Sequence, residues 1–390
     1  MIWPYIILSY ISLFVFGLSD NVRGPLFPEI MKEFAVNDSM GSWMFALSSI
    51  SGFLSSYLTR NLLRRFDRMT VLRGGSIALI VSLIGLATAP HFYVFLFFSL
   101  AFGMSLGILG LIPNVLVSLG SSEERKQQLM SGLHAMYGVA SFCSPLIAAS
   151  VEVLTGSWRW TFGIITLVPA ALLLYSFHGS HANLHQKAEF VPENHKLNKA
   201  RNFKPQIFLA FMVSFCVCAE IMVSSRLALF MRRTADYDME HSSLYVTYFF
   251  VGMLTGRSLF ALIKLPFTLR TQLSASLVLT GLCILGGVYI HPVFLPITGF
   301  AVAPFYPLAI TWISSKFPTD LDSAVSYMMA TDSMMLVGMH LLIGHFTDTK
   351  GIAFAMLLLG PIYCLLSFLL VNSYEYFFER HQPQDDSNIA

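Results

Sequence analysis

Two long apolar stretches of this chain each carry a carboxylate and a guanidinium. Asp20 and Arg23 lie three residues apart, so a helix would place them on one face, where they could pair. Glu220 and Arg226 lie six residues apart and would be poorly aligned for pairing within one helix. A guanidinium offers a fork of hydrogen-bond donors to an anionic or hydroxyl-rich solute, and a carboxylate can take up a proton.

These four residues also have a structural interpretation. They could form ion pairs that only stabilise the fold, or the arginines could extend their head groups towards the membrane surface. An ionisable side chain inside a membrane span is costly, however, and is by default a functional candidate. We therefore predict substrate binding for Arg23 and Arg226, and proton coupling for Asp20 and Glu220.

Aspartate and histidine in other apolar stretches extend the set of possible proton carriers. Asp332 and His340 lie eight residues apart, roughly on one face of a helix, and His134 lies in a separate stretch. An imidazole titrates near neutral pH and suits a proton relay, although a hydrogen-bonded core histidine is the structural alternative. We predict proton coupling for Asp332 and His134.

Neutral polar residues could bind a solute by hydrogen bonds alone. Asn114 and Tyr306 lie in apolar stretches and carry an amide and a hydroxyl, so we predict that both take part in substrate binding. Arg257 lies near the end of its stretch, where a gate or a packing contact is the simpler role. We predict gating for Arg257.

The elements that must position these residues are membrane helices. Of the 390 residues, 55% are hydrophobic and only 12% are charged, whereas soluble domains average about 25% charged residues. A stretch of about 20 apolar residues spans a bilayer as a helix, because its backbone polar groups must be satisfied within the segment. Twelve such stretches are predicted: 2–31, 39–60, 69–90, 92–120, 126–154, 158–177, 205–232, 242–263, 268–290, 293–316, 321–346 and 351–378. The sequence thus predicts an all-α polytopic membrane protein with 12 transmembrane helices in two pseudo-symmetric six-helix bundles.

A polar segment divides these stretches into two halves. We predict an N-terminal six-helix bundle at 1–177, a central loop at 178–204, a C-terminal six-helix bundle at 205–378 and a polar tail at 379–390. The spacing of the histidines in the central loop matches no zinc pattern, so we predict a solvated linker with no metal site and no cofactor. Lys and Arg gather in loops on the side of both termini, which predicts cytoplasmic termini. The compact loops fit a bacterial inner membrane.

Short motifs resemble those of the major facilitator superfamily. Residues 156–162, Gly-Ser-Trp-Arg-Trp-Thr-Phe, are similar to the superfamily's Gly-Trp-Arg-x-x-Phe signature. Residues 64–68, Arg-Arg-Phe-Asp-Arg, resemble a degenerate form of its Asp-Arg-x-Gly-Arg loop, with Arg in place of Asp and Asp in place of Gly. That resemblance implies gating roles for Arg65 and Arg68.

Four segments are similar to the fucose permease-like sugar:proton symporters of that superfamily. They are 114–120, 133–145, 255–257 and 303–307. Those symporters carry a membrane-embedded Glu where this chain has Gly110, so any proton carrier must be one of the other residues named above.

The combined prediction is a secondary transporter that moves a small polar solute, such as a sugar, by alternating access, with protons as the candidate coupling ion. Transport of organic anions bound by the paired arginines is an alternative, and a transporter-like membrane sensor is another. No Walker loop, nucleophile elbow or metalloprotease motif predicts an enzyme. The expected partners are the solute, the lipid bilayer and protons, and the net charge of +2 gives no reason to expect a nucleic acid.

Overall fold

The described part of the chain folds into helices joined by short connections. The computed structural model describes residues 1–122, 124–178, 199–263, 265–317 and 321–378. Fifteen helices and no strands occur within these ranges, which confirms the predicted all-α class. Most of the predicted central loop and the whole predicted tail lie outside the described residues, so the domain boundaries remain predictions.

The first half of the chain forms helices that match the first six predicted stretches. They are α1 (Trp3–Asn21), α2 (Arg23–Phe34), α3 (Asp38–Arg65), α4 (Arg68–Thr88), α5 (Phe92–Gly120), α6 (Lys126–Thr155), α7 (Arg159–Ile165) and α8 (Leu167–Ser176). The first stretch is broken into α1 and α2, and the sixth into α7 and α8.

The second half repeats this pattern. Its helices are α9 (Lys199–Thr234), α10 (Met239–Leu262), α11 (Leu269–Tyr289), α12 (Phe294–Val302), α13 (Phe305–Lys316), α14 (Leu321–Lys350) and α15 (Ile352–Phe378). Here the broken stretch is the tenth, which forms α12 and α13.

A proline follows each of the three breaks. The prolines are Pro25, Pro169 and Pro307. A proline ring clashes with the carbonyl four residues earlier and removes a helical hydrogen bond. Accordingly, α1 ends at Asn21 and α7 at Ile165, each four residues before its proline. The break after Asn21 lies between Asp20 and Arg23, two of the residues predicted to carry protons or bind the solute.

Nine segments within the described residues are long and apolar enough to cross a membrane. The helices α3, α10 and α14, of 28, 24 and 30 residues, pack across the two halves, α3 against α14 and α10 against α6. Part of the surface of each of these helices therefore faces protein instead of lipid.

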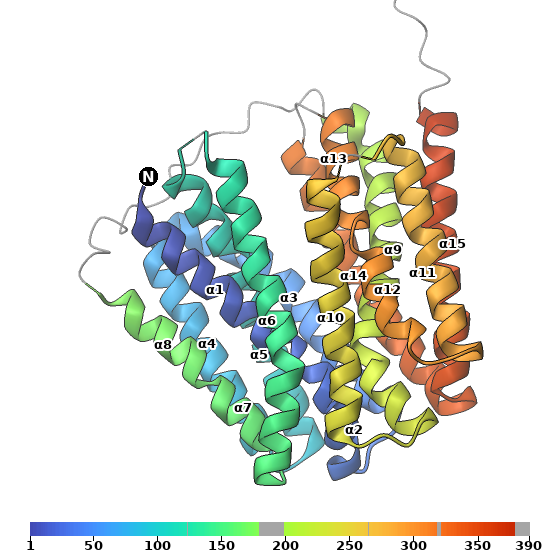
Figure 1. Ribbon diagram of the computed structural model, residues 1–390. Helices are drawn as coiled ribbons and strands as arrows, with labels where there is room; N and C mark the ends of the chain where they lie inside the picture. The colour runs from blue at the N-terminus through green and yellow to red at the C-terminus, as the bar shows by residue number, and fades with distance from the viewer. Residues whose placement is uncertain (123, 179–198, 264, 318–320, 379–390) are drawn as a thin grey trace, which may run out of the picture.

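The two halves lie side by side and meet mainly at one end (Figure 1). The N-terminus and the end of α15 lie at the upper end of the view, where the two groups of helices are separated. At the lower end, α2 packs against α9 of the other half. We call this lower end, remote from the termini, the closed end.

Candidate functional site

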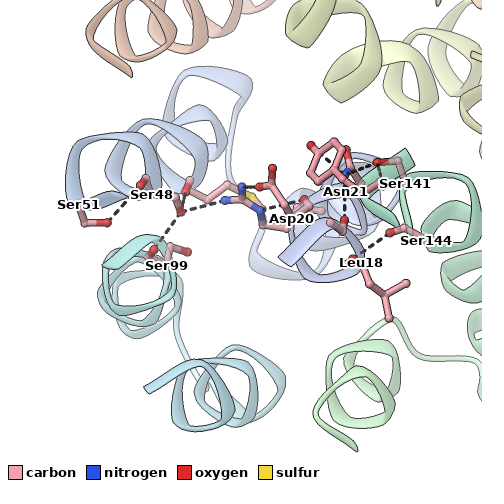
Figure 2. A network of polar contacts seen from close by, with 12 residues as sticks. Leu18, Asp20, Asn21, Ser48, Ser51, Ser99, Ser141 and Ser144 are labelled. Carbon is pink, nitrogen blue, oxygen red and sulfur yellow. Dashed lines mark hydrogen bonds and ion pairs between the residues drawn. The ribbon is translucent and has the colours of Figure 1, made fainter. Parts of the chain in front are cut away.

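The break between α1 and α2 places Asp20 and Arg23 at a junction of helices (Figure 2). Arg23 pairs with the carboxylate of Asp20, as the sequence predicts, and its Nη1 donates to Ser48 Oγ on α3 at 2.9 Å. Ser48 Oγ lies 2.9 Å from the carbonyl oxygen of Ser99 on α5 and donates to it. The Arg23 side chain is 9% exposed and that of Asp20 is 28% exposed. A proton or solute can therefore reach the carboxylate more easily than the guanidinium.

Asn21 ties the same break to α6. Its Nδ2 donates to Ser141 Oγ at 2.9 Å and to the Tyr137 hydroxyl at 3.2 Å. Ser144 Oγ on α6 donates to the carbonyl oxygen of Leu18 at 3.1 Å (Figure 2). The polar residues around Asp20 are thus fixed by both α3 and α6, two helices of this half that pack against the other half.

Glu220 on α9 faces Arg257 on α10. The distance from Glu220 Oε1 to Arg257 Nη2 is 3.8 Å, which is long for a direct hydrogen bond, and the two side chains are 15% and 32% exposed. Glu220 is therefore opposed by Arg257 of another helix and not by Arg226 of its own helix. A loosely held pair of this kind leaves donors and acceptors for a solute.

Tyr137, from the first half, and Tyr306, from the second, both lie near these groups. The Tyr137 hydroxyl lies close enough to Asp20, Glu220 and Arg257 for their charges to act on it. The Tyr306 hydroxyl is similarly close to Asp332, Glu220 and Arg257. We call the resulting set, which comes from both halves and is partly exposed, the central polar cluster: Asp20, Asn21, Tyr137, Glu220, Arg257, Tyr306 and Asp332.

Asp332 is held by the helix beside it. Its Oδ1 accepts a hydrogen bond from Ser214 Oγ on α9 at 2.6 Å. His134 on α6 is exposed and close enough to Arg257 for their charges to interact. Both predicted proton carriers therefore lie at or beside the central polar cluster.

Arg226 lies elsewhere, buried at the closed end. It is 1% exposed, and its Nη2 donates to Ser42 Oγ of the other half at 2.9 Å. Its guanidinium carbon lies 4.1 Å from the ring centre of Phe27 and 4.8 Å from that of Phe45. Among the described residues, Arg226 Nη1 has no hydrogen-bond partner. Arg23 and Arg226 both lie against Phe45, with the guanidinium carbon of Arg23 at 5.2 Å and that of Arg226 at 4.8 Å from the ring centre.

Contacts between α3 and the other half hold the closed end together. The carboxylate of Asp348 at the end of α14 accepts from the backbone amides of Asp38 and Ser39, both at 2.8 Å. These are the first two amides of α3, which lack partners within their own helix. Asp38 in turn pairs with Arg233 Nη1 at 2.8 Å. The end of α3 is therefore capped by a residue from the opposite half.

Beside this cap, the backbone of α14 at Gly344 approaches the backbone of α3 closely. A Cβ added to Gly344 would lie 2.7 Å from the carbonyl oxygen of Asp38 and 2.3 Å from Ser42 Oγ. Only glycine allows α14 and α3 to approach this closely. The halves are consequently in direct backbone contact at the closed end.

The remaining predicted residues lie apart from these contacts. Asn114 donates its amide to the carbonyl oxygen of Gly110, one turn earlier on the same helix. Arg65 and Arg68 lie where α3 gives way to α4, at the opposite end of α3 from the cap. No group of three or more metal-ligating side chains occurs within the ranges described.

Sequence reasoning missed several residues that the fold brings to these sites. Asn21 and Tyr137 carry polar groups within apolar stretches. The position of Asn21 directly after Asp20 could have marked it as a site residue. Phe45 gave no signal, since one phenylalanine among 34 cannot be distinguished by its sequence alone.

Comparisons with known proteins agree with this architecture. The family model described as Major Facilitator Superfamily matches residues 9–331. Protein TsgA of Salmonella newport (strain SL254) is 22% identical over 370 residues, covering 91% of this chain and 86% of the relative. A TsgA homolog of Buchnera aphidicola is 19% identical over 380 residues, covering 93% of this chain and 94% of the relative.

Two further similarities differ in how much of the chain they cover. Bypass of stop codon protein 6 of Saccharomyces cerevisiae is 32% identical over 180 residues, which cover 42% of this chain and 35% of that relative. A crystal structure of a mutant of the peptide transporter POT matches with a TM-score of 0.74 at 13% identity, covering 95% of this chain and 94% of the other. At this identity the likeness concerns the fold. With the family model matched over most of its length, the chain belongs to the major facilitator superfamily.

Proposed function

We propose that this protein is a secondary transporter that carries a small polar solute across a membrane by alternating access, and that the solute binds at the central polar cluster. The single observation behind this proposal is that partly exposed polar groups from both halves converge between them. A solute bound there would touch both halves and could follow their relative movement. Membership of the major facilitator superfamily supports membrane transport as the activity.

The position of the closed end supports a site that the solute reaches from the side of the termini. Contacts involving Asp38, Gly344 and Asp348 seal the end remote from the termini, while the halves are separated at the other end. If both termini are cytoplasmic, as the distribution of Lys and Arg predicts, the conformation is open to the cytoplasm. A bacterial inner membrane remains our proposal for its location.

Proton coupling is part of this proposal. Asp20, Glu220 and Asp332 are carboxylates inside the helical bundle, and each faces a group that its charge state would affect: Arg23, Arg257 and Ser214 respectively. His134 is a candidate relay because it lies near Arg257. A carboxylate that gains a proton loses its attraction for its arginine, which frees donors for the solute.

Two classes of solute are compatible with the cluster. A sugar would use the neutral groups, above all the hydroxyls of Tyr137 and Tyr306. Asn114 is a weaker candidate because it already donates to its own helix. An organic anion would use Arg257, whose contact with Glu220 is long and whose side chain is 32% exposed. We propose that Arg257 binds solute, in place of the gating role expected from the sequence.

The first test is a thermal-shift screen of the purified protein in detergent, because a ligand that binds the folded state raises the melting temperature. The panel contains neutral sugars and small carboxylates at acidic and neutral pH. Hits are then tested for uptake into proteoliposomes under an imposed pH gradient.

A pair of arginine variants locates the site. Arg257→Gln should abolish the shift caused by a carboxylate, because it removes the arginine that would bind the anion. Arg226→Gln should retain the shift, since Arg226 is buried at the closed end. Loss of the shift in Arg226→Gln alone would place the site at the closed end and contradict the proposal. Binding without any uptake would favour the membrane-sensor alternative.

A further inference from the structure

We propose that a cavity between α11, α13 and α15, at the end of the second half that lies on the side of the termini, binds the head group of an anionic phospholipid. Its phosphate would lie between Arg270 and Lys316. This inference goes beyond the proposed function, because none of the described residues that line the cavity belongs to the central polar cluster.

The cavity has the size and the charge of a site for a small anion. Its volume is about 660 Å³, within the usual range of about 300–1,000 Å³ for small-molecule sites. Arg270, Lys316 and Glu375 are the charged residues among its described lining, and together they carry a net charge of +1. A phosphodiester carries one negative charge, which would neutralise this set. Basic pockets between membrane helices bind anionic head groups through this attraction.

Arg270 is held in place but can still exchange its counter-ion. Its Nε and Nη2 donate to the side-chain and backbone oxygens of Asn372 at 3.1 and 2.9 Å, which fixes the guanidinium between α11 and α15. Its Nη1 lies 2.6 Å from Glu375 Oε2, and the two side chains are 37% and 47% exposed. An ion pair as exposed as this contributes little to stability. A phosphate could therefore replace Glu375 as the partner of Arg270 at small cost.

The first half contains a related arginine that separates packing from binding. Arg73 on α4 donates to the side-chain and backbone oxygens of Ser176, at the end of α8, at 3.1 and 2.6 Å. The ring centre of Phe177 lies 4.1 Å from its guanidinium carbon. An arginine alone thus ties two helices together in each half. The cavity and the carboxylate beside Arg270 are not needed for that contact, so they call for another explanation.

Polar groups that suit a phosphate or a polyol line the same cavity. They are the hydroxyls of Thr268, Thr271, Ser274 and Ser315 and the amide of Asn372. Ser274 Oγ accepts a hydrogen bond from Asn372 Nδ2 at 3.1 Å. A hydroxyl can donate to a phosphate oxygen and also accept from a ligand hydroxyl. This lining favours a head group that itself carries hydroxyls, such as the glycerol of phosphatidylglycerol.

The height of the cavity favours a lipid over a soluble anion. Arg270 is the second residue of α11 and Lys316 the last of α13, so both lie where their helices reach the membrane surface. The end of α15, with Glu375 in its last turn, lies at the same upper end of Figure 1. Trp312, which also lines the cavity, packs against Tyr374 at 5.4 Å between ring centres. Tryptophan and tyrosine are enriched at this level of membrane proteins.

The cavity also extends towards the apolar layer. Phe368, another lining residue, precedes Glu375 by seven positions and lies about 10 Å deeper along α15. Leu365 and Leu369 share the helix face of Asn372 and are 55% and 49% exposed. Below the polar groups, this face of α15 therefore offers an apolar surface to acyl chains. A soluble phosphate ester would leave that surface unused.

Native mass spectrometry of the delipidated protein in detergent tests the proposal. Phosphatidylglycerol is the probe, and phosphatidylcholine with the same acyl chains is the reference, because it has the same phosphodiester but no net charge. Phosphatidylglycerol should bind about fivefold more tightly than phosphatidylcholine, since one basic residue near the membrane surface contributes about that factor. Equal binding of the two lipids would overturn the inference.

The ion pair supplies two variants with opposite expected effects. Arg270→Gln and Glu375→Gln both break the contact between α11 and α15 at this pair. Arg270→Gln should weaken the binding of phosphatidylglycerol about fivefold, whereas Glu375→Gln should strengthen it by a similar factor, because it removes a charge that repels the phosphate. Weakening in both variants would show that the pair acts only through the structure.

Two further variants complete the set. Lys316→Gln should weaken the binding of phosphatidylglycerol as Arg270→Gln does, so the test stands even if Arg270→Gln fails to fold. Arg73→Gln is the matched control, since it removes the related contact in the first half and should leave the affinity unchanged. An equal loss in Arg73→Gln would show that the lipid binds by charge at no particular site.

A soluble head group separates the two sources of phosphate. Glycerophosphoglycerol, which is phosphatidylglycerol without its acyl chains, should not displace the lipid at equal concentration, because the apolar surface of α15 contributes to binding. Displacement at equal concentration would assign the cavity to a soluble phosphate ester and overturn the lipid assignment. Since none of these measurements involves transport, either outcome leaves the proposed function standing.

Discussion

The close approach of α14 to α3 at the closed end leaves no room for a side chain at Gly344. In Gly344→Ala the new Cβ would lie 2.7 Å from the backbone carbonyl oxygen of Asp38 and 2.3 Å from Ser42 Oγ. The serine hydroxyl could rotate away, but the carbonyl belongs to the first turn of α3 and can move only with the helix. Overpacking of this kind costs about 1–3 kcal/mol. Since the clash exists only when the two halves touch, the cost falls on the closed form alone.

The expected result is a decrease in the closed-to-open ratio of about 5- to 150-fold, the equivalent of that free energy. Gly338→Ala is the matched control, because it lies on the same helix and a Cβ there has no atom within 4 Å. Both substitutions stabilise α14 by about 1 kcal/mol, because alanine has a higher helix propensity than glycine. This gain does not change the closed-to-open ratio, since α14 is helical in both forms.

Spin-label distances between Leu154 on α6 and Glu240 on α10, both exposed at the closed end, provide the assay once the five native cysteines are replaced by alanine, with thermal unfolding as a check on folding. Gly344→Ala should shift the distances to longer values, and Gly338→Ala should not. If both variants gave the wild-type distribution, the closed end would not depend on backbone contact between α3 and α14. Our account of closure would then be wrong.

Two other predictions concern close contacts of α3. Asp348→Ala should lower the closed-to-open ratio about fivefold, since a capping carboxylate at a helix N-terminus contributes about 1 kcal/mol; unchanged label distances would show that the cap is incidental. Gly103→Ala should lower the melting temperature, because its Cβ would lie 2.2 Å from the carbonyl oxygen of Ser48, whereas Gly74→Ala, with no atom within 4 Å, should not.

The candidate site was only partly predictable from the sequence. The pair of Asp20 and Arg23 follows from their spacing, because residues three apart share a helix face. The partner of Glu220 does not follow, since Arg257 lies on another helix and only packing of α9 against α10 brings them together. For the same reason the sequence suggested Arg226 as a cavity residue, although it is buried against Phe27 and Ser42.

The sequence by itself determined the helical stretches but not the places where they break. Apolar length requires helices in a bilayer, and this length can be read one stretch at a time. A proline follows each break, but Pro113, Pro145 and Pro361 lie inside unbroken helices, so a proline alone does not place a break.

Only the tertiary structure decided which charged side chains are partly exposed and which are buried. Arg226 is 1% exposed against Phe27 and Phe45, whereas the Arg257 side chain is 32% exposed opposite Glu220. The cap that Asp348 provides for α3 joins residues about 310 positions apart. Such contacts depend on how the two halves dock, and no periodicity within one helix encodes that arrangement.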